Sequence, residues 1–229
     1  MTLYEVDAFE KGFEPGEIFR FVKRMNEGRE GKSKIVRVWR VFILPDGTRA
    51  GVVRLDKIVR ARAGGTGIHY SWDLPFKGET LIEEIRGKSI IGVNPYTISF
   101  TRDGKLVYKA RLKDGRCVIL KGDTVIEEIQ GRRFKELSRL LALSDGTVAG
   151  VVELEDDRWV PFKGDALLEE IEDRKVMHSY LIYSLPDGTF AGQVETLYEE
   201  REIHEYFFWH GHEVYIPQPP DPDRARDLD

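Results

Sequence analysis

The sequence predicts an all-β protein built from a repeated unit of four antiparallel strands, like a small β-propeller of four or five blades with one short N-terminal helix. The main observation is a repeat. Asp-Gly turns at Asp103, Asp145 and Asp187 follow one another at intervals of 42 residues, within the range of propeller blades. Each turn lies between two apolar strands, and in the second and third units a third strand ending at Lys-Gly and a charged strand of the Leu-Leu-Glu-Glu-Ile type follow. One unit cannot bury its own apolar face, so neighbouring units must stack.

The composition supports a packed and heavily charged protein. The chain has 229 residues, 41% hydrophobic and 33% charged, which is ample for a core. Asn and Gln are nearly absent, at positions 26, 94, 130, 193 and 218 only. Many charged residues with few thermolabile amides are typical of hyperthermophile proteins. A mesophile protein with a charged surface is the alternative.

Three features of the sequence limit its location. Cys117 is the single cysteine, so no internal disulfide can hold the fold. No apolar stretch approaches the ~18 residues of a membrane span. The N-terminus lacks the basic region and apolar run of a signal peptide. We therefore expect a soluble, cytoplasmic protein that does not contact a membrane.

Residues 1–35 form an N-terminal segment that precedes the repeats. Residues 3–9 suggest a short strand, and the apolar residues between Ile18 and Met25 have helical spacing. Pro15 and Glu17 suit a helix start, and Asn26-Glu27-Gly28 would end the helix. The alternative is that residues 11–22 are a degenerate half repeat and form a strand.

Residues 36–216 form the repeat domain, and residues 217–229, rich in proline and charge, predict a flexible tail. Each unit starts with an apolar strand and an Asp-Gly hairpin, because Asp-Gly supplies the positive φ that such a turn needs. The first unit contains an insertion at residues 57–71. The apolar strands before the four hairpins are at residues 36–43, 96–100, 140–143 and 180–183.

Two questions about these repeats stay open in the sequence. Residues 123–143 also fit a helix, because Thr124 could cap it and apolar residues from Phe134 onward have helical spacing. A proline before the equivalent segment of the second unit favours strands instead.

The fourth unit lacks its Glu-Glu strand. Residues 3–9 or 18–22 could supply it and close a ring. The alternatives are an unclosed β-meander or barrel, and an α+β fold.

Part of the second unit resembles a known family. Ile98-Ser99-Phe100-Thr101-Arg102-Asp103-Gly104-Lys105-Leu106-Val107-Tyr108, followed by Val118 to Asp123, is similar to the WD40-like repeats of TolB-type β-propellers. The resemblance covers residues 36–215. It implies a propeller that binds or scaffolds other molecules, and no particular activity. The sequence departs from the pattern because Trp-Asp occurs only once, at Trp72-Asp73, and only four hairpins are visible.

Basic residues are concentrated near the start of the repeats. Residues 20–62 contain 13 basic and 4 acidic residues, whereas the whole chain has a net charge of -5. Trp39 lies between Arg37 and Arg40, an arrangement that could hold single-stranded nucleic acid by stacking beside charge. The glycine-rich insertion could form a binding loop. A solvated strand face and a long solvated loop are the alternatives. The predicted binding residues are Arg37, Trp39, Arg40, Arg60, Arg62, His69 and Tyr70.

Histidines near the C-terminus form the densest group of metal-ligand residue types. His210 and His212 would point to one side of a strand, and His204 is close in sequence. The His-Gly-His segment occupies a turn of the repeat, so a solvated turn is the alternative. The Glu-Glu pairs recur at one position of the repeat, at residues 83–84, 127–128 and 169–170, which indicates an exposed outer strand.

No catalytic motif is present: the sequence lacks Gly-x-Ser-x-Gly, His-Glu-x-x-His, Cys-x-x-Cys and dinucleotide fingerprints. We therefore predict no catalytic residue and no cofactor. The first hypothesis is a non-catalytic protein-interaction or scaffold module with a protein partner. The second is a nucleic-acid-binding accessory protein that uses residues 20–62. The third is a metal-dependent hydrolase at His204, His210 and His212.

Overall fold

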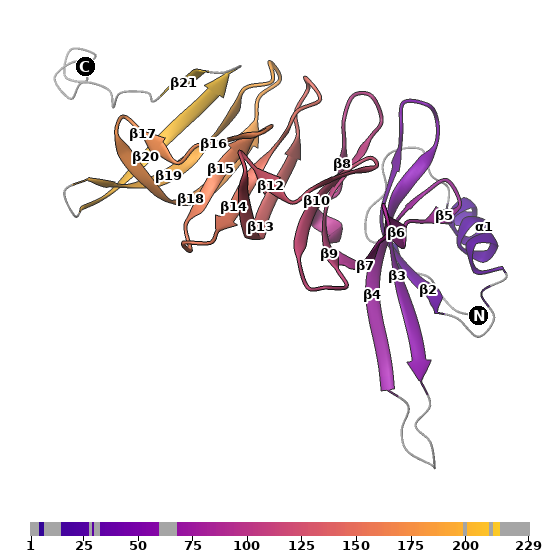
Figure 1. The fold of residues 1–229 in the computed structure, drawn as a ribbon. Helices are drawn as coiled ribbons and strands as arrows, with labels where there is room; N and C mark the ends of the chain where they lie inside the picture. The colour runs from indigo at the N-terminus through magenta and orange to yellow at the C-terminus, as the bar shows by residue number, and fades with distance from the viewer. Residues whose placement is uncertain are drawn as a thin grey trace, which may run out of the picture.

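The computed structural model describes most of the chain, and about two thirds of the described residues lie in β-strands. The strands form four sheets that follow one another in a row, from indigo to yellow in Figure 1. The predicted all-β class is therefore confirmed. The described residues are 5–6, 15–27, 29, 33–59, 68–198, 201–210 and 213–215.

The first sheet contains the first predicted unit. Its strand order is β1-β2-β3-β4-β5, with β1 parallel to β2 and the other neighbours antiparallel. The strands β2, β3 and β4 correspond to the predicted hairpin and third strand. The bounds are β1 (Glu5–Val6), β2 (Lys34–Ile43), β3 (Arg49–Val59), β4 (Ile68–Lys77) and β5 (Thr80–Leu81).

In the second sheet the first strand is interrupted. β7 (Lys88–Val93) and β8 (Ser99–Phe100) both pair with β9 (Leu106–Leu112), and the 3-10 helix η1 (Pro95–Thr97) separates them. Pro95 has no amide hydrogen for the ladder, and the Asn94 side chain caps the turn by accepting from the Tyr96 amide at 2.9 Å. The other strands are β6 (Glu84–Ile85), β10 (Cys117–Lys121) and β11 (Thr124–Ile126).

The third and fourth sheets are regular. Residues 124–142 form strands, so the strand prediction for this region is confirmed and the helical alternative is wrong. The third sheet consists of β12 (Glu128–Ile129), β13 (Arg132–Ala142), β14 (Val148–Leu154), β15 (Trp159–Lys163) and β16 (Ala166–Leu167). The fourth consists of β17 (Glu170–Ile171), β18 (Arg174–Ser184), β19 (Phe190–Tyr198), β20 (Arg201–His210) and β21 (Glu213–Tyr215).

Each charged segment of the Leu-Ile-Glu-Glu-Ile type connects two sheets. Its first part, such as β5, pairs with the third strand of its own unit, and its last part, such as β6, pairs with the first long strand of the next unit. The prediction of a single outer strand is therefore wrong. Arg86 and Gly87 both have positive φ, 50° and 75°, as a type I′ hairpin turn requires, and this turn starts the next sheet.

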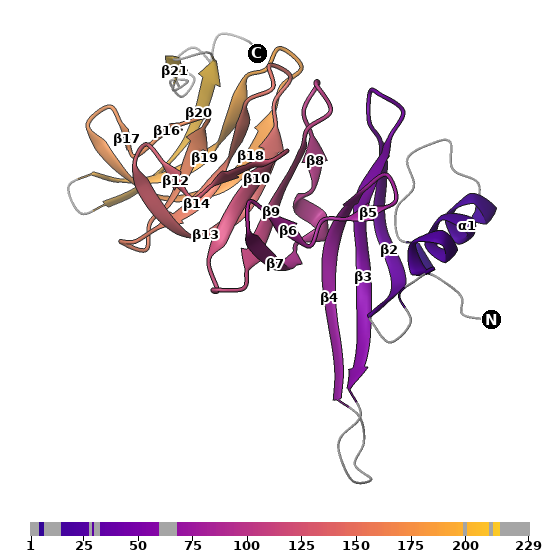
Figure 2. The same ribbon diagram turned by 45° about the vertical axis from the view of Figure 1, so that its right-hand side comes forward.

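The N-terminal helix is confirmed as α1 (Pro15–Asn26), and the strand alternative for residues 11–22 is wrong for the residues described. Phe21, Val22 and Met25 are buried, and the Phe21 ring lies 5.0 Å from that of Phe76 in β4. The helix therefore covers the outer face of the first sheet, at one end of the row (Figure 2).

The predicted Asp-Gly hairpins are confirmed. At the third, the Gly146 amide donates to the Leu143 carbonyl at 3.0 Å, and the Asp145 carboxylate accepts from the Thr147 amide at 2.7 Å. Gly146 has a φ of 81°, as in a type I turn followed by a glycine bulge. These turns hold the long strands in register.

The row of sheets is open in the part of the chain that the structure describes. The first and last sheets lie at opposite ends (Figures 1 and 2). β1 pairs with β2, and residues 18–22 belong to α1, so the prediction that one of these segments completes the last sheet is wrong. The hydrophobic core lies between successive sheets, in one cluster from α1 to the second sheet and another from the second sheet to the fourth. None of the helices described is long and apolar enough to cross a bilayer.

Candidate functional site

Exposed aromatic side chains gather on the last sheet. Of the ten large hydrophobic residues exposed among those described, six belong to β18–β21. Residues that face each other across antiparallel strands share a face, and Gln193 faces Tyr206 while Glu195 faces both His178 and His204. We call this surface the terminal face. It comprises His178, Tyr180, Tyr183, Gln193, Glu195, Leu197, His204 and Tyr206.

The middle of the terminal face is a connected cluster. The Tyr180 ring lies 4.6 Å from that of His178 and 5.6 Å from that of His204. The Tyr180 hydroxyl donates to the Glu195 carboxylate, and this bond raises the pKa of Tyr180 above its usual value. Tyr180 therefore stays a neutral donor that is held in place. Tyr206, beside the cluster, is 54% exposed.

The equivalent face is covered in the earlier units. In the first and third sheets, Val52 faces Pro75 and Val151 faces Pro161, and all four residues are buried. These pairs correspond to Gln193 and Tyr206. In all three sheets the first residue of the pair directly follows a glycine that faces a phenylalanine on the next strand. The last sheet thus exposes a surface that the preceding units bury.

The next sheet provides that cover. Phe42 of the first sheet contacts Phe100 of the second, with ring centroids 5.5 Å apart. Val107, Cys117 and Ile119 of the second sheet belong to the same hydrophobic cluster as the third sheet. The Lys163 ammonium of the third sheet donates to the Trp209 carbonyl of the fourth at 3.4 Å. Beyond the fourth sheet, no further sheet follows in the part of the chain described.

The insertion of the first unit extends β3 and β4 into a two-stranded arm that projects beyond the row (Figures 1 and 2). Lys57 faces Tyr70 on this arm, and Tyr70 is 50% exposed. The Nε2 atom of His69 lies 3.0 Å from the Asp56 carboxylate. Two of the predicted binding residues, Arg60 and Arg62, lie outside the described residues.

Trp39 is surrounded by charged groups between the first and second sheets. The guanidinium carbons of Arg37 and Arg54 lie 4.1 Å and 4.6 Å from the centre of its ring. Its indole nitrogen donates to Asp73 at 2.6 Å, and Asp73 also accepts from Arg54. The ring therefore already has cationic partners, which reduces its use for stacking a base. The structure brings Arg37 and Trp39 together, whereas the Arg40 guanidinium lies 5.4 Å from the Phe42 ring centre.

The basic residues of positions 20–62 do not form one free surface. Some are on α1, some on β2 and some on the arm. Four arginines among those described form ion pairs with acidic residues. The carboxylates offset their positive charge, so these arginines attract an outside ligand less strongly. The pairs are Arg24 with Glu79, Arg29 with Glu83, Arg49 with Glu17, and Arg54 with Asp73.

The described histidines do not converge on a metal site. His204 and His210 are six residues apart on β20, about 20 Å at the rise of a strand, whereas zinc–nitrogen bonds are about 2 Å. One ion cannot bind both. His210 Nδ1 lies 2.8 Å from the Thr189 hydroxyl, and His212 is outside the described residues. No group of three metal-ligand side chains is found in the described part of the chain.

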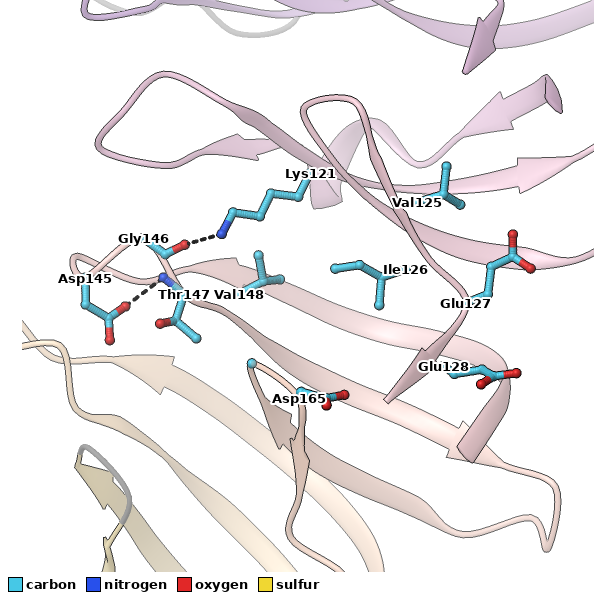
Figure 3. A pocket seen from close by; sticks show the side chains of 11 residues that line it. Lys121, Val125, Ile126, Glu127, Glu128, Asp145, Gly146, Thr147, Val148 and Asp165 are labelled. Atoms are coloured by element: carbon cyan, nitrogen blue, oxygen red, sulfur yellow. Dashed lines mark hydrogen bonds between the residues drawn. The ribbon is translucent and has the colours of Figure 1, made fainter. Parts of the chain in front are cut away.

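A groove of about 720 Å³ lies between the second and third sheets (Figure 3). The Lys121 ammonium spans it and donates to the Gly146 carbonyl at 2.8 Å. An equivalent groove, of about 580 Å³, lies between the first and second sheets, with Lys77 in the place of Lys121. Because the groove repeats with the units, we interpret it as part of the scaffold.

The Glu-Glu pairs and Cys117 are also structural. Glu169 accepts from Arg158 at 2.6 Å, whereas its neighbour Glu170 is exposed. The prediction that both members of each pair are exposed is therefore confirmed for Glu83 and Glu84, whereas in the other two pairs only the second glutamate is exposed. Burial raises the pKa of the Cys117 thiol to about 12, with the carboxylate of Glu136 adding to the effect. Such a thiol is a poor nucleophile at neutral pH.

The terminal face was not predicted from the sequence. Tyr180, Tyr183 and Tyr206 look like ordinary strand residues there. A signal was nevertheless present: Tyr206 occupies the repeat position that holds Pro75 and Pro161 in the first and third units. Comparison with known proteins gives no further identification, since no family model matches the chain and no curated protein matches it.

Proposed function

We propose that this chain is a non-catalytic protein-interaction module that binds its partner through the terminal face. The observation that supports this proposal is the exposure of Tyr206, because the equivalent positions Pro75 and Pro161 are buried under the next sheet. Tyrosine is enriched at protein interfaces, since its ring buries a large apolar area and its hydroxyl can donate a hydrogen bond. Glu195 and the two histidines nearby add polar groups that give specificity.

Site-specific cross-linking tests this function. A photo-activatable phenylalanine analogue replaces Tyr206 in one variant and, as a control, Tyr96 in another; Tyr96 is 77% exposed but lies in η1, far from the last sheet in the sequence. After irradiation in the source cytosol, the analogue at position 206 should give discrete protein adducts that the analogue at position 96 does not give. Equal adducts from both positions would mean that the terminal face has no special role.

Nucleic-acid binding through the arm is a second candidate function. The observation in its favour is that the arm is a projecting two-stranded ribbon, a shape that fits the major groove. Replacing Lys57, Arg60 and Arg62 with Ala should then abolish a binding that weakens with salt. The control replaces Arg24, Arg29 and Arg49, which removes the same number of charges from arginines in ion pairs. Failure of the wild-type protein to bind DNA or RNA at low salt would exclude this candidate.

A further inference from the structure

The repeat indicates which surface fits the terminal face. We propose that two copies of this chain associate through their terminal faces in a symmetric dimer; this inference rests on the proposed function and names the partner as a second copy. The face that corresponds to the terminal face in each earlier unit is covered by a β-sheet of the same repeat. A sheet of this kind is therefore the cover that the architecture already uses.

The two ends of the row differ. At the first end, α1 places Phe21, Val22 and Met25 on the outer face of the first sheet. At the last end, the described residues provide no such cover, and Tyr206 and Leu197 are 54% and 41% exposed. Repeat arrays need a cap at each end, because an apolar terminal face is poorly soluble. Association through the last end would provide the second cap.

The helix at the first end also decides the symmetry. Head-to-tail stacking would bring the terminal face of one copy onto the first sheet of the next copy, but α1 already occupies that place. With head-to-tail stacking excluded, two copies can associate through this surface only if the terminal face of one packs on the terminal face of the other. Such an isologous contact closes with two copies and does not propagate into a filament.

The terminal face is large enough for a specific contact. Its strands β18, β19 and β20 have 11, 9 and 10 residues. At ~3.4 Å per residue and ~4.8 Å between strands, they cover roughly 500 Å². Two such faces would bury about 1,000 Å², at the lower limit of specific interfaces, which corresponds to a weak dimer.

The charges of this face suit association with itself. Glu195 lies between His178 and His204 across the three strands. At the end of the face, Leu197 separates Lys175 from Glu202. Because groups of both signs occur on one face, a twofold rotation can bring carboxylates of one copy near basic groups of the other. A face of a single sign would repel its own copy.

Mass measurement across concentration tests the dimer. Light scattering after gel filtration, from about 1 µM to about 500 µM, should show a rise from the 26.4 kDa of one chain toward twice that mass, with a micromolar Kd. Tyr206→Glu and Leu197→Glu should each raise this Kd at least about tenfold, since each buries an unpaired carboxylate in the contact. Tyr96→Glu, at an exposed tyrosine of η1, should leave it unchanged.

Three outcomes would overturn the dimer. A wild-type chain that stays monomeric throughout the range is one, and an equal effect of Tyr96→Glu is another. The third is a chain that dimerises only after residues 217–229 are removed. Those proline-rich residues, and not a second copy, would then occupy the terminal face of the intact chain. Thermal unfolding of each variant checks that it is folded. If the chain is monomeric but position 206 still captures another protein, the proposed function holds and the dimer alone fails.

Discussion

Gly150 lies directly opposite Phe162 across β14 and β15, and a methyl group on Gly150 would stand 2.6 Å from the Phe162 ring. The same methyl group would strike the carbonyl oxygen of Arg139. A bulge between Leu137 and Arg139 shifts the register of β13 at this point. Packing therefore requires glycine here, because the aromatic ring occupies the space above its Cα atom.

Gly150→Ala should lower the free energy of unfolding by about 1–3 kcal/mol, the range for an overpacked site. Gly92→Ala is the matched control, because an added Cβ there meets no atom within 4 Å. That substitution should change stability by less than about 1 kcal/mol and can increase it. Urea denaturation of the three proteins measures both effects. A similar loss at Gly92 would show that strand propensity, and not the contact with Phe162, determines the result.

In the second sheet the pair is reversed. Tyr108 takes the place of the glycine and faces Leu120, so the ring comes from the opposite strand. The Tyr108 hydroxyl is buried without a hydrogen-bond partner among the described residues. Burial, together with the nearby carboxylate of Asp123, raises the pKa of this hydroxyl above its usual range. The group is therefore desolvated and keeps its proton.

Tyr108→Phe should raise the free energy of unfolding by about 1 kcal/mol, because it removes a buried polar group that has lost its hydrogen bond to water. Tyr96→Phe is the control, since Tyr96 is 77% exposed, and it should have no measurable effect. Both are measured by chemical denaturation. A destabilised Tyr108→Phe protein would mean that the hydroxyl has a partner in solution, such as a bound water or ligand.

The elements predicted correctly have local sequence signals. The Asp-Gly hairpins need a positive φ at glycine, and α1 has Pro15 and Glu17 at its start. The turns that begin each new sheet have weaker signals. In the fourth sheet, Glu172 and Asp173 both have positive φ, 48° and 63°, although neither is the usual residue for this turn. The change of sheet within each charged segment was therefore not predicted.

The open row and the terminal face depend on packing over long distances. A 42-residue period fixes the unit but not the angle between units, which depends on side chains such as Val52 and Ile119 in the interfaces. The exposure of Tyr206 is visible only when its register against Gln193 is known. Sequence analysis predicted a binding function, but it placed the candidate binding residues on the first unit, where Trp39 already has partners.

Ion pairs at the sheet junctions should contribute measurably to stability. The side chain of Arg158 is 6% exposed and donates to Glu169 at 2.6 Å, to Asp156 at 2.9 Å and to the Val176 carbonyl at 3.2 Å. Arg132 also donates to Glu169. Burial alone would raise the pKa of Glu169, but hydrogen bonds from the two arginines outweigh it and lower the pKa.

Glu169→Gln should lower the free energy of unfolding by about 1–3 kcal/mol, because it removes a charged partner of the nearly buried Arg158. Glu170→Gln is the matched control: the residue is adjacent and exposed, and we expect a change below about 0.5 kcal/mol. Thermal and urea denaturation at low salt measure the difference. Equal effects of the two substitutions would show that the junction contributes nothing beyond general surface charge.

Acid should unfold the protein through the aspartates of the hairpin turns. Hydrogen bonds from Lys105 and Thr101 lower the pKa of Asp103 to about 2, and the other turn aspartates also have lowered pKa values: Asp46, Asp114, Asp145, Asp156 and Asp187. A carboxylate whose pKa is lower in the folded state stabilises that state above its unfolded pKa, about 3.9 for Asp. This contribution is lost as the pH falls through the folded value.

The free energy of unfolding should therefore change little between about pH 7 and pH 5 and then fall between about pH 4 and pH 2. Urea midpoints measured across this range test the expectation. Asp103→Asn should reduce the slope between about pH 4 and pH 2, because Asn keeps the acceptor oxygen but does not titrate. Glu170→Gln, an exposed residue with the same change of charge, serves as the control and should leave this slope nearly unchanged. If both variants have the slope of the wild type, the turn at Asp103 does not contribute to acid unfolding.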